Sequence, residues 1–338
     1  MAPGRVAMAV VAVVVLGAWL GAALLLRGRP PATEAEAAQF GTWVRGAELL
    51  GQTGLAVRAR HGHRIVHQSW KTERVPSGLM ARCFASWGRT HPDALHVLWT
   101  DEDNERLVRE HYPEWAALYA ALPMSIMRAD LVRLLYLHRF GGVYVDMDFE
   151  ARSDLFAALP RDGAGALAEV YLAESPVPLL GVTENSLMAA TTLEHPFWRE
   201  CVATIAAIMD LVQRPGACAR FNWSGCLALL PLFQSPLFGK LMYLTHLLDM
   251  TGPNVLAKTL VAHLAQPWRV RLLPRDRFHL DASVTVHHQM NSWMVVFKMW
   301  ELFLFGAFVL AALVGLGAVL MWCALRRHPH EPDRKRDL

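Results

Sequence analysis

Apolar positions recur with helical spacing over residues 126–140, and a short apolar segment follows directly. The recurring positions on the helical part are Met127, Leu131, Leu134, Leu135 and His138. The paired glycines Gly141 and Gly142 end this helix, because glycine accepts the left-handed backbone that many helix C-termini adopt. The pattern therefore predicts a helix over 126–140 and a strand over 143–148.

The same reading predicts alternating strands and helices upstream of this segment. We expect a strand over 64–67, a helix over 79–90, a strand over 94–99 and a helix over 101–110. This order, followed by the strand over 143–148, predicts an α/β fold with a mostly parallel sheet flanked by helices. In such folds, ligands bind at the carboxyl ends of the strands.

Two carboxylates, Asp146 and Asp148, lie at the end of the predicted strand. Side chains alternate between the faces of a strand, so these two project to one side and Met147 to the other. Carboxylate oxygens are ligands that Mg²⁺ and Mn²⁺ prefer. The spacing therefore predicts a site for one divalent cation that also holds the oxygens of a diphosphate.

On the preceding helix, Asp130 and Arg133 are three residues apart and share a face. There they can reach ribose or sugar hydroxyls and phosphate. Each acidic or ionic pair taken alone is more often a solvated feature of the surface, worth little to stability. The combination of both pairs around one helix-to-strand turn is what indicates a catalytic metal site.

Long apolar segments at both ends of the chain predict membrane spans. Residues 6–26 carry no charge and have about the ~20-residue length that a bilayer-spanning helix needs, and residues 302–325 form the second such segment. The first exceeds the usual roughly 7–15-residue core of a cleaved signal, which favours a retained signal anchor. Cleavage near Gly21 is the alternative.

These segments divide the 338-residue chain. We expect a short N-terminus at 1–5, a transmembrane signal anchor at 6–26, a stem or linker with some helix at 27–62, a catalytic domain at 63–301, a transmembrane helix at 302–325 and a basic tail at 326–338. The positive-inside rule places the basic tail in the cytosol. Two spans then place the N-terminus there as well, and the catalytic domain in the lumen.

The apolar segment over 226–250 has three interpretations. Two prolines, Lys240 and His246 interrupt it, which favours an interfacial or re-entrant segment over a third span. A buried core helix remains open, because length and hydrophobicity alone do not separate it from a helix in the headgroup region. A third span would move the basic tail to the lumen.

Charge and cysteine content narrow the partners only slightly. The formal net charge of +3 is spread along the chain and forms no basic stripe interleaved with aromatic residues, so we expect no nucleic-acid partner. Of the five cysteines, Cys218 and Cys226 are the candidate bridge in an oxidising lumen. Asn222 lies between them in a triplet that fits the N-glycosylation acceptor pattern.

The run R-A-D-x-x-R-x-x-x-L-x-x-x-G-G-x-Y-x-D-x-D over 128–148 resembles the D-x-D sugar-binding region of glycosyltransferase family 32. This family includes the inositol phosphoceramide mannosyltransferases (mannosyl phosphorylinositol ceramide synthases) and the yeast initiating α-1,6-mannosyltransferases. The resemblance covers roughly residues 64–293, through 65–71 and 91–101 upstream and through 181–185, 195–198, 251–253 and 287–293 downstream. One departure is a long apolar insertion between Trp198 and Thr251.

The resemblance implies a GT-A fold and a retaining, Mn²⁺- or Mg²⁺-dependent hexosyltransferase in the Golgi or ER membrane. It favours GDP-mannose as the donor and a membrane lipid headgroup such as inositol phosphoceramide as the acceptor. UDP-galactose or UDP-glucose as donor, and a glycolipid or glycan as acceptor, remain open. It also implies contact with the lipid bilayer and with a small regulatory membrane subunit.

The resemblance also implies roles for individual residues. Asp148 is the expected direct metal ligand, and Asp146 is expected to contact metal, ribose or sugar. The implied catalytic residues are Asp146, Asp148, Asp130 and Arg133, and the implied donor-binding residues are Trp70, Arg128, Asp130, Arg133, Tyr144 and Asp146. Glu184 and Asn185 are expected on the acceptor side, with a capped loop as the alternative. His288 is expected as a late metal contact, with His287 as the alternative.

Two other classes share parts of this pattern. A phosphatase of the haloacid-dehalogenase type also carries Asp-x-Asp at a strand end, but it lacks the Gly-Gly-x-Tyr lead-in found at 141–144. A non-catalytic membrane scaffold or lectin would keep the fold without the reaction. Metal-dependent hydrolysis of a nucleotide sugar would exclude the scaffold, and a trapped aspartyl phosphate would favour the phosphatase.

Overall fold

The computed structural model of the protein describes residues 30–175, 183–213, 250–279 and 282–288. The predicted spans at 6–26 and 302–325, the basic tail and the segment over 226–249 lie outside these residues, as do Asn222, Cys218 and Cys226. Among the helices within the described ranges, none has the length and apolar character needed to cross a bilayer.

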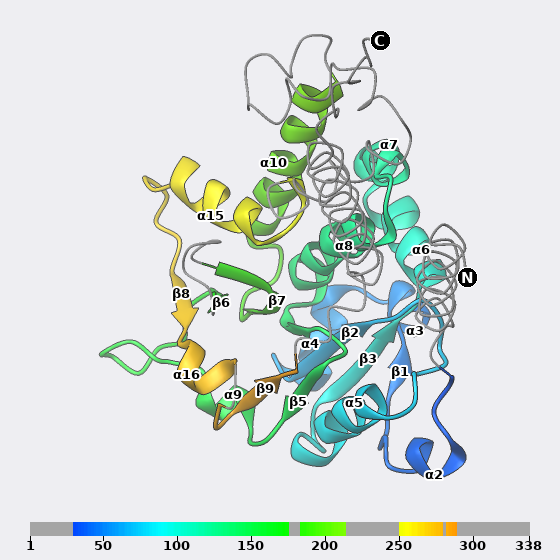
Figure 1. Ribbon diagram of the computed structural model, residues 1–338. Coiled ribbons are helices and arrows are strands. Elements are labelled where there is room, and N and C mark those ends of the chain that lie inside the picture. Colours follow the sequence, from blue (N-terminus) through cyan, green and yellow to red (C-terminus); the bar gives the residue numbers. More distant parts are fainter. Residues whose placement is uncertain (1–29, 176–182, 214–249, 280–281, 289–338) are drawn as a thin grey trace, which may run out of the picture. The chain divides into compact units, whose positions relative to one another are not determined.

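A seven-stranded sheet with the order β1-β3-β2-β4-β7-β6-β8 forms the centre of the domain (Figure 1). Its strands are β1 (Val44–Arg45), β2 (Ile65–Ser69), β3 (Leu95–Trp99), β4 (Gly142–Val145), β6 (Val170–Glu174), β7 (Thr183–Ala190) and β8 (Val270–Leu273). Neighbouring strands are parallel except for the two pairs that β7 makes, with β4 and with β6. The predicted α/β fold with a mostly parallel sheet is therefore confirmed.

A separate two-stranded antiparallel sheet pairs β5 (Phe149–Ala151) with β9 (Thr285–His287). The two strands are far apart in the sequence, yet Phe149 lies directly opposite His287 in the register. This pairing brings a late segment of the chain next to the end of β4.

The three helices predicted over 79–90, 101–110 and 126–140 are all present. The described helices are α2 (Glu34–Ala37), α3 (Ala47–Leu50), α4 (Gly54–His61), α5 (Leu79–Thr90), α6 (Asp101–His111), the 3₁₀ helix η1 (Pro113–Trp115), α7 (Ala116–Ala121), α8 (Ser125–Phe140), α9 (Leu155–Ala158), α10 (Pro196–Gln213), α15 (Pro253–Ala262) and α16 (Arg275–Phe278). The predictions for α5, α6, α8, β2 and β3 are confirmed to within two residues at each end.

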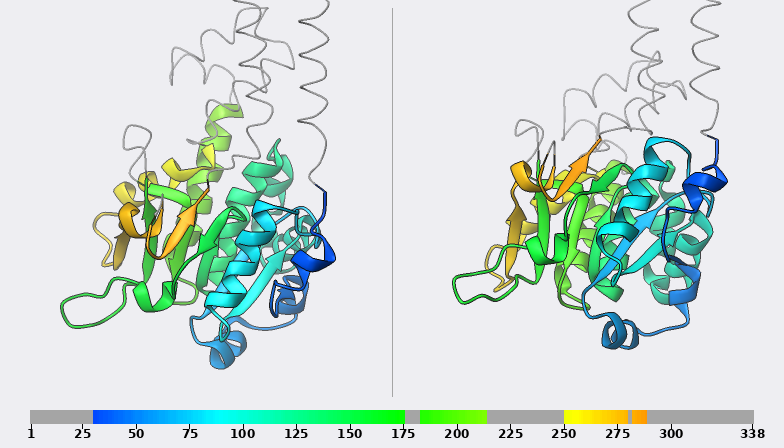
Figure 2. Two further views of the ribbon diagram at one scale, coloured as in Figure 1. Left: turned by 60° about the horizontal axis from the view of Figure 1, so that its bottom comes forward. Right: turned by 90° about the horizontal axis from the view of Figure 1, so that it is seen from below.

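Helices α5 and α8 cover opposite faces of the sheet (Figure 2). The adjacent residues Val66 and His67 of β2 contact different helices. Val66 belongs to the apolar cluster that contains Trp87 of α5. The ring of His67 instead stacks on Tyr136 of α8, with 5.7 Å between ring centroids. All five apolar-face positions predicted for the helix over 126–140 are buried, so that face is the one that α8 presents to the core.

The stem predicted over 27–62 is corrected in its described part. Residues from Pro30 onward belong to the same compact unit as the rest of the domain. The segment carries helices, as expected, but it also supplies β1, which pairs in parallel with β3 at the sheet edge. Leu49, Leu50 and Val57 are buried. A short strand with few apolar residues leaves no periodicity to detect, since its place depends on pairing with β3.

The strand predicted over 143–148 ends earlier than expected, at Val145. Asp146 and Asp148 therefore do not owe their proximity to strand alternation. They lie in a turn in which the backbone N–H of Phe149 donates to the carbonyl of Asp146 at 3.1 Å. The turn itself is held to β7, because the N–H of Asp146 donates to the carbonyl of Ser186 at 2.9 Å.

The two glycines between α8 and β4 allow the close approach on which this arrangement depends. Gly141 and Gly142 have φ angles of +66° and +81°, in the left-handed region that favours glycine. A Cβ atom on Gly142 would overlap the carbonyl oxygen of Ile65 in β2. The missing side chain thus lets β4 start directly against β2.

We predict that Gly142→Ala destabilises the fold by at least about 1–3 kcal/mol, the range for a non-glycine residue held in an unfavourable backbone region. Chemical denaturation of both proteins measures the difference. Gly163→Ala is the matched control, because no atom lies within 4 Å of the added Cβ at Gly163. Equal stability of the two variants would contradict the packing argument.

Candidate active site

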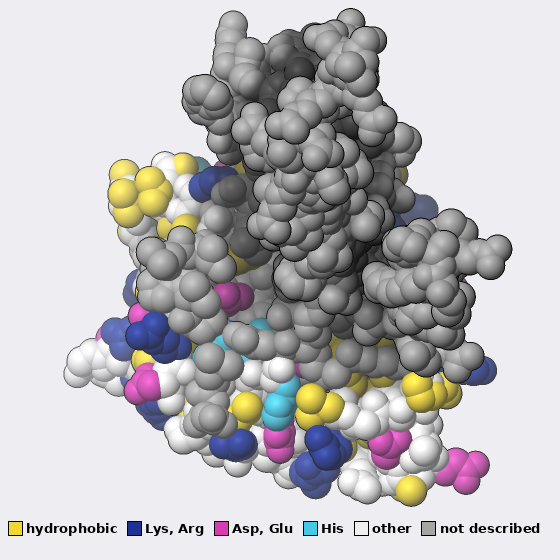
Figure 3. Space-filling model, in the orientation of Figure 1, with side chains coloured by type: hydrophobic (Ala, Val, Ile, Leu, Met, Phe, Trp, Pro, Cys, Tyr) yellow, Lys and Arg dark blue, Asp and Glu magenta, His cyan; other side chains and the backbone are white. Residues whose placement is uncertain are grey.

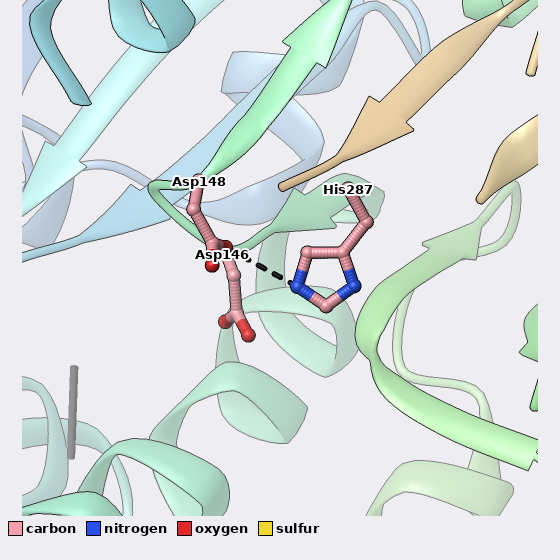
Figure 4. A group of neighbouring side chains, drawn as sticks. All are labelled: Asp146, Asp148 and His287. Atoms are coloured by element: carbon pink, nitrogen blue, oxygen red, sulfur yellow. Dashed lines mark ion pairs between the residues drawn. The ribbon is translucent and has the colours of Figure 1, made fainter. Parts of the chain in front are cut away.

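Asp146, Asp148 and His287 each offer one ligand atom, and the three atoms lie within 4.8 Å of one another (Figure 4). The carboxylates come from the turn after β4, and the imidazole comes from the last residue of β9. The Nε2 atom of His287 lies 3.4 Å from Oδ1 of Asp148. Figure 4 shows the imidazole facing the two carboxylates, so the three side chains converge on one position.

The chemistry of these three side chains fits a divalent cation. Two carboxylates and one imidazole suit Mn²⁺, whereas Mg²⁺ prefers oxygen ligands alone. The side chain of Asp146 keeps 31% of its surface exposed, which leaves a way in for an ion and a substrate. On the face seen in Figure 3, histidine and acidic side chains lie close together below the centre of the view.

Two neighbours hold the ring of His287. Phe149 of β5 stacks on it with 4.3 Å between centroids and an interplanar angle of 14°. Asp148 accepts a hydrogen bond from the ring and supplies negative charge. Burial lowers the pKa of His287, but the interactions with Asp148 outweigh burial, so the pKa is raised overall.

The expected preference for His288 is corrected in favour of His287. The ring of His288 turns away from the two aspartates, and its Nε2 lies 2.9 Å from Oε2 of Glu150. Only its backbone touches the turn, since the N–H of His288 donates to the carbonyl of Asp148 at 3.0 Å. Successive residues of an extended chain point to opposite sides, which is why only one of the two histidines reaches the carboxylates.

A buried charge network lies beneath Asp146. Arg133 and Asp130 of α8 are 3% and 4% exposed, and Nη2 of Arg133 lies 3.2 Å from Oδ1 of Asp130. Nη1 of Arg133 lies 3.4 Å from Oδ1 of Asp146. The hydroxyl of Tyr144 donates to that same oxygen at 2.6 Å, and the guanidinium stacks over the Tyr144 ring at 4.6 Å. The Arg133 guanidinium thus links Asp130 on α8 to Asp146 in the acidic turn.

Two residues from distant segments complete this network. Asn185 of β7 donates from Nδ2 to Asp130 at 2.9 Å, and its carbonyl accepts from Arg133 at 2.8 Å. The hydroxyl of Thr251 donates to the second Asp130 oxygen at 2.9 Å. Burial raises the pKa of Asp130 to about 6 even though Arg133 and these hydrogen bonds favour its charged form. Asn185 thus belongs to this network, and its expected role on the acceptor side stays a prediction.

The remaining predicted residues lie around the same edge of the sheet. Trp70 directly follows β2, where its N–H donates to the carbonyl of Trp99 at 2.9 Å. Arg128 at the start of α8 donates from Nη1 to the carbonyl of Leu122 at 3.0 Å. Glu184 of β7 is partly buried, and its burial raises the pKa of its carboxyl group. The charge of His287 lowers this pKa, and the charge of Asp146 raises it.

Sequence reasoning missed the part that late segments play in positioning these groups. Thr251 was noted only as part of a resembling block, and nothing in the apolar pattern indicates that it bonds to Asp130. His279, which lies behind His287, was not identified at all. A strand signal at 284–287, where valines alternate with Thr285 and His287, was the available hint.

Residues 78–164 match the protein-family model described as "Glycosyltransferase sugar-binding region containing DXD motif". The similarity is limited to this region of the chain. The region contains Asp130, Arg133, Asp146 and Asp148, whereas Thr251 and His287 come from beyond it. The glycosyltransferase resemblance drawn from the sequence is thereby confirmed for the region that carries the acidic turn.

Curated relatives match over partial lengths. Inositol phosphoceramide mannosyltransferase 2 of Schizosaccharomyces pombe is 36% identical over 96 residues, which is 28% of each chain. Mannosyl phosphorylinositol ceramide synthase SUR1 of Saccharomyces cerevisiae is 34% identical over 147 residues, covering 42% of this chain and 34% of the relative. The initiation-specific alpha-1,6-mannosyltransferase of Candida albicans is 36% identical over 66 residues, or 19% of this chain and 17% of the relative. The matched segments thus span less than half of each relative.

Among solved structures, the chain is similar to a protein titled PaToxG Glycosyltransferase. The TM-score is 0.40 at 12% sequence identity, and the match covers 65% of this chain and 78% of that chain.

We predict that Arg133→Met destabilises the fold by about 3–5 kcal/mol, because it leaves buried carboxylates without their cation. Denaturant unfolding of the variant and the wild type measures the loss. Arg109→Met is the matched control, since that side chain is 64% exposed and its contact with Glu110 is 3.5 Å long, so we expect little change. A stability loss of similar size in both variants would refute the role of Arg133.

Proposed function

We propose that this protein is a metal-dependent, retaining glycosyltransferase that moves mannose from GDP-mannose to a membrane lipid headgroup such as inositol phosphoceramide. One observation carries the proposal. The Asp146–Asp148–His287 cluster lies next to the buried Asp130–Arg133 pair, within 3.4 Å of it at Asp146. A cation site and a set of sugar and phosphate contacts thus share one edge of an α/β sheet.

The proposed reaction separates a sugar from its diphosphate, which leaves negative charge on the departing group. A bound divalent cation supplies charge neutralisation to that group. Asp148 and His287 would hold the cation, and Asp146 would share it while keeping its bond to Tyr144. Catalysis would be chiefly electrostatic, and we assign no protein nucleophile or general base.

Arg133 and Asp130 would fix the donor sugar. Asp130 is held by Asn185 and Thr251, so its carboxylate keeps one orientation, and Arg133 spans from it to Asp146. Rigid placement of such groups lowers the entropy lost on reaching a reactive geometry. The donor base would lie near Trp70, which follows the carboxyl end of β2, the edge where α/β sheets bind nucleotides.

The choice of mannose and of a phosphoinositol ceramide acceptor comes from the relatives. Two of them are named as enzymes that act on inositol phosphoceramide or make its mannosylated form, and a third is named as a mannosyltransferase. UDP-galactose or UDP-glucose as donor, with a glycolipid or glycan as acceptor, is the alternative. Arg128 would contribute to the donor side, and Glu184 would line the acceptor side.

The membrane setting is part of the proposal. We propose a GT-A-type catalytic domain in the Golgi or ER lumen, anchored by spans at 6–26 and 302–325, with both termini cytosolic. Apolar anchors would hold the domain near lipid acceptors in the same bilayer. A small regulatory membrane subunit is a further expected partner. A non-catalytic scaffold with the same fold is the alternative, and sugar transfer by the purified protein would exclude it.

We predict that the membrane-embedded protein with Mn²⁺ and a panel of nucleotide sugars adds hexose to a lipid only with GDP-mannose. Asp148→Asn should lower turnover by roughly 10²–10³-fold, equivalent to about 2.7–4 kcal/mol, because it removes a key electrostatic group. Mass analysis of the lipid extract identifies donor and acceptor in one assay.

Glu34→Gln is the control for that experiment, because it removes one carboxylate charge from an exposed helix turn at α2. Its activity should equal that of the wild type. Full activity of Asp148→Asn, or full activity in excess chelator, would rule out the metal-dependent mechanism. If transfer occurs only from a uridine nucleotide sugar, the donor is not GDP-mannose and the transferred sugar is not mannose.

To test the membrane topology, we predict that protease digests an epitope placed after Leu338 in sealed microsomes. An epitope inserted near Gly163 should be protected. The physical reason is the basic tail, which the positive-inside rule keeps in the cytosol. Detergent should expose both epitopes, which controls for intact vesicles. Protection of the tail together with exposure near Gly163 would reverse the orientation.

A further inference from the structure

His279 lies directly behind His287, on the side away from the carboxylates. Its Nε2 atom is 3.0 Å from Nδ1 of His287, while Nε2 of His287 faces Asp148. The side chain comes from the end of α16 and is 1% exposed. A backbone bond fixes the pair further, since the N–H of His287 donates to the carbonyl of His279 at 3.1 Å.

A ligand role for His287 dictates where its proton lies. To bind a cation through Nε2, the neutral ring needs a free lone pair there and therefore carries its proton on Nδ1. That Nδ1–H group points at Nε2 of His279, which must then accept the hydrogen bond. His279 would in turn carry its own proton on Nδ1.

Stacking on Phe149 does not determine which ring atom of His287 faces the carboxylates. Stacking fixes the plane of the His287 ring, but a ring flipped by half a turn about its Cβ–Cγ bond stacks equally well on the phenyl group. The flipped ring would place carbon atoms where Nε2 and Nδ1 now lie. The contact of Nε2 with Asp148 and the hydrogen bond of Nδ1 with His279 both select the orientation with Nε2 forward, and the bond to His279 is the one that persists when Nε2 holds a cation.

His279 makes this contact at a cost to stability. Its Nδ1 atom is buried and has no hydrogen-bond partner among the described residues. An unpaired buried polar group lowers the stability of the fold. An apolar side chain of similar size would fill the same space without that cost, which indicates that the imidazole serves the site and not the core.

We propose that His279 is a positioning residue that holds His287 as an Nε2 ligand of the divalent cation. The proposal rests on the proposed function, because it presupposes the cation site. Groups that support a metal-binding histidine in this way are typically worth 10–100-fold in metal affinity.

Titration of the purified protein with Mn²⁺, followed by electron paramagnetic resonance of the free ion, tests this directly. His279→Met removes the acceptor and should weaken Mn²⁺ binding by roughly 10–100-fold. His279→Gln keeps an acceptor oxygen and should restore most of the affinity. His263→Met, on a partly exposed histidine that pairs with Glu200, should bind Mn²⁺ like the wild type.

A spectroscopic signature separates positioning from simple structural support. Pulsed magnetic resonance of Mn²⁺-loaded wild type should show coupling to a ¹⁴N nucleus of a bound imidazole, and His279→Met should lose or weaken that coupling. Thermal unfolding without metal identifies any variant that fails to fold. In that event, ¹⁵N-histidine resonances of the wild type loaded with diamagnetic Zn²⁺, which accepts imidazole ligands, decide the question, because the proposal requires metal-bound His287 to be protonated on Nδ1.

The outcomes distinguish this inference from the proposed function. Wild type that binds Mn²⁺ while His279→Met keeps the same affinity and the same ¹⁴N coupling would overturn only the role of His279. A His287 ring protonated on Nε2 in the metal-loaded wild type would do the same. Wild type that binds no Mn²⁺ would overturn the metal site itself, and the positioning role with it.

Discussion

The Arg133 guanidinium is the group on which the rest of the site depends. Asp130, Asp146 and Asp148 bring three carboxylates into a small, largely buried volume, and such groups are costly to bury unless they are paired. Arg133 lies between the first two and also bonds to the carbonyl of Asn185. Helix α8, the acidic turn and strand β7 are thereby joined through one side chain, in a place where mutual repulsion would otherwise separate them.

The second constraint is the pairing of β5 with β9, which carries His287 to the acidic turn. Phe149 follows Asp148 directly, so a strand that begins at Phe149 places its partner residue beside the carboxylates. The same pairing brings α16 and His279 behind the imidazole. The residues that match the glycosyltransferase model end at 164, so the third candidate ligand and its positioning residue come from the far end of the described chain.

Much of the fold and part of the site followed from local pattern. Helix α8 was predictable because its apolar positions recur with a helical period and two glycines end it. The two acidic residues were predictable, but the backbone structure that brings them together was not. A turn and not a strand places Asp146 beside Asp148. The strand β1 was missed, because two residues at a sheet edge carry no periodic signal and gain their place only by pairing with β3.

The sequence by itself determined the α/β order, the identity of the Asp146 and Asp148 pair, the Asp130–Arg133 pair and the similarity of residues 78–164 to the glycosyltransferase model, because each depends on residues close together in the chain. Only the tertiary structure decided between His287 and His288, placed Asn185 in the Asp130 network, and brought in Thr251 and His279. The physical reason is that hydrogen bonds and strand pairing between distant segments depend on register and side-chain direction, and a shift of one residue turns a side chain to the opposite face.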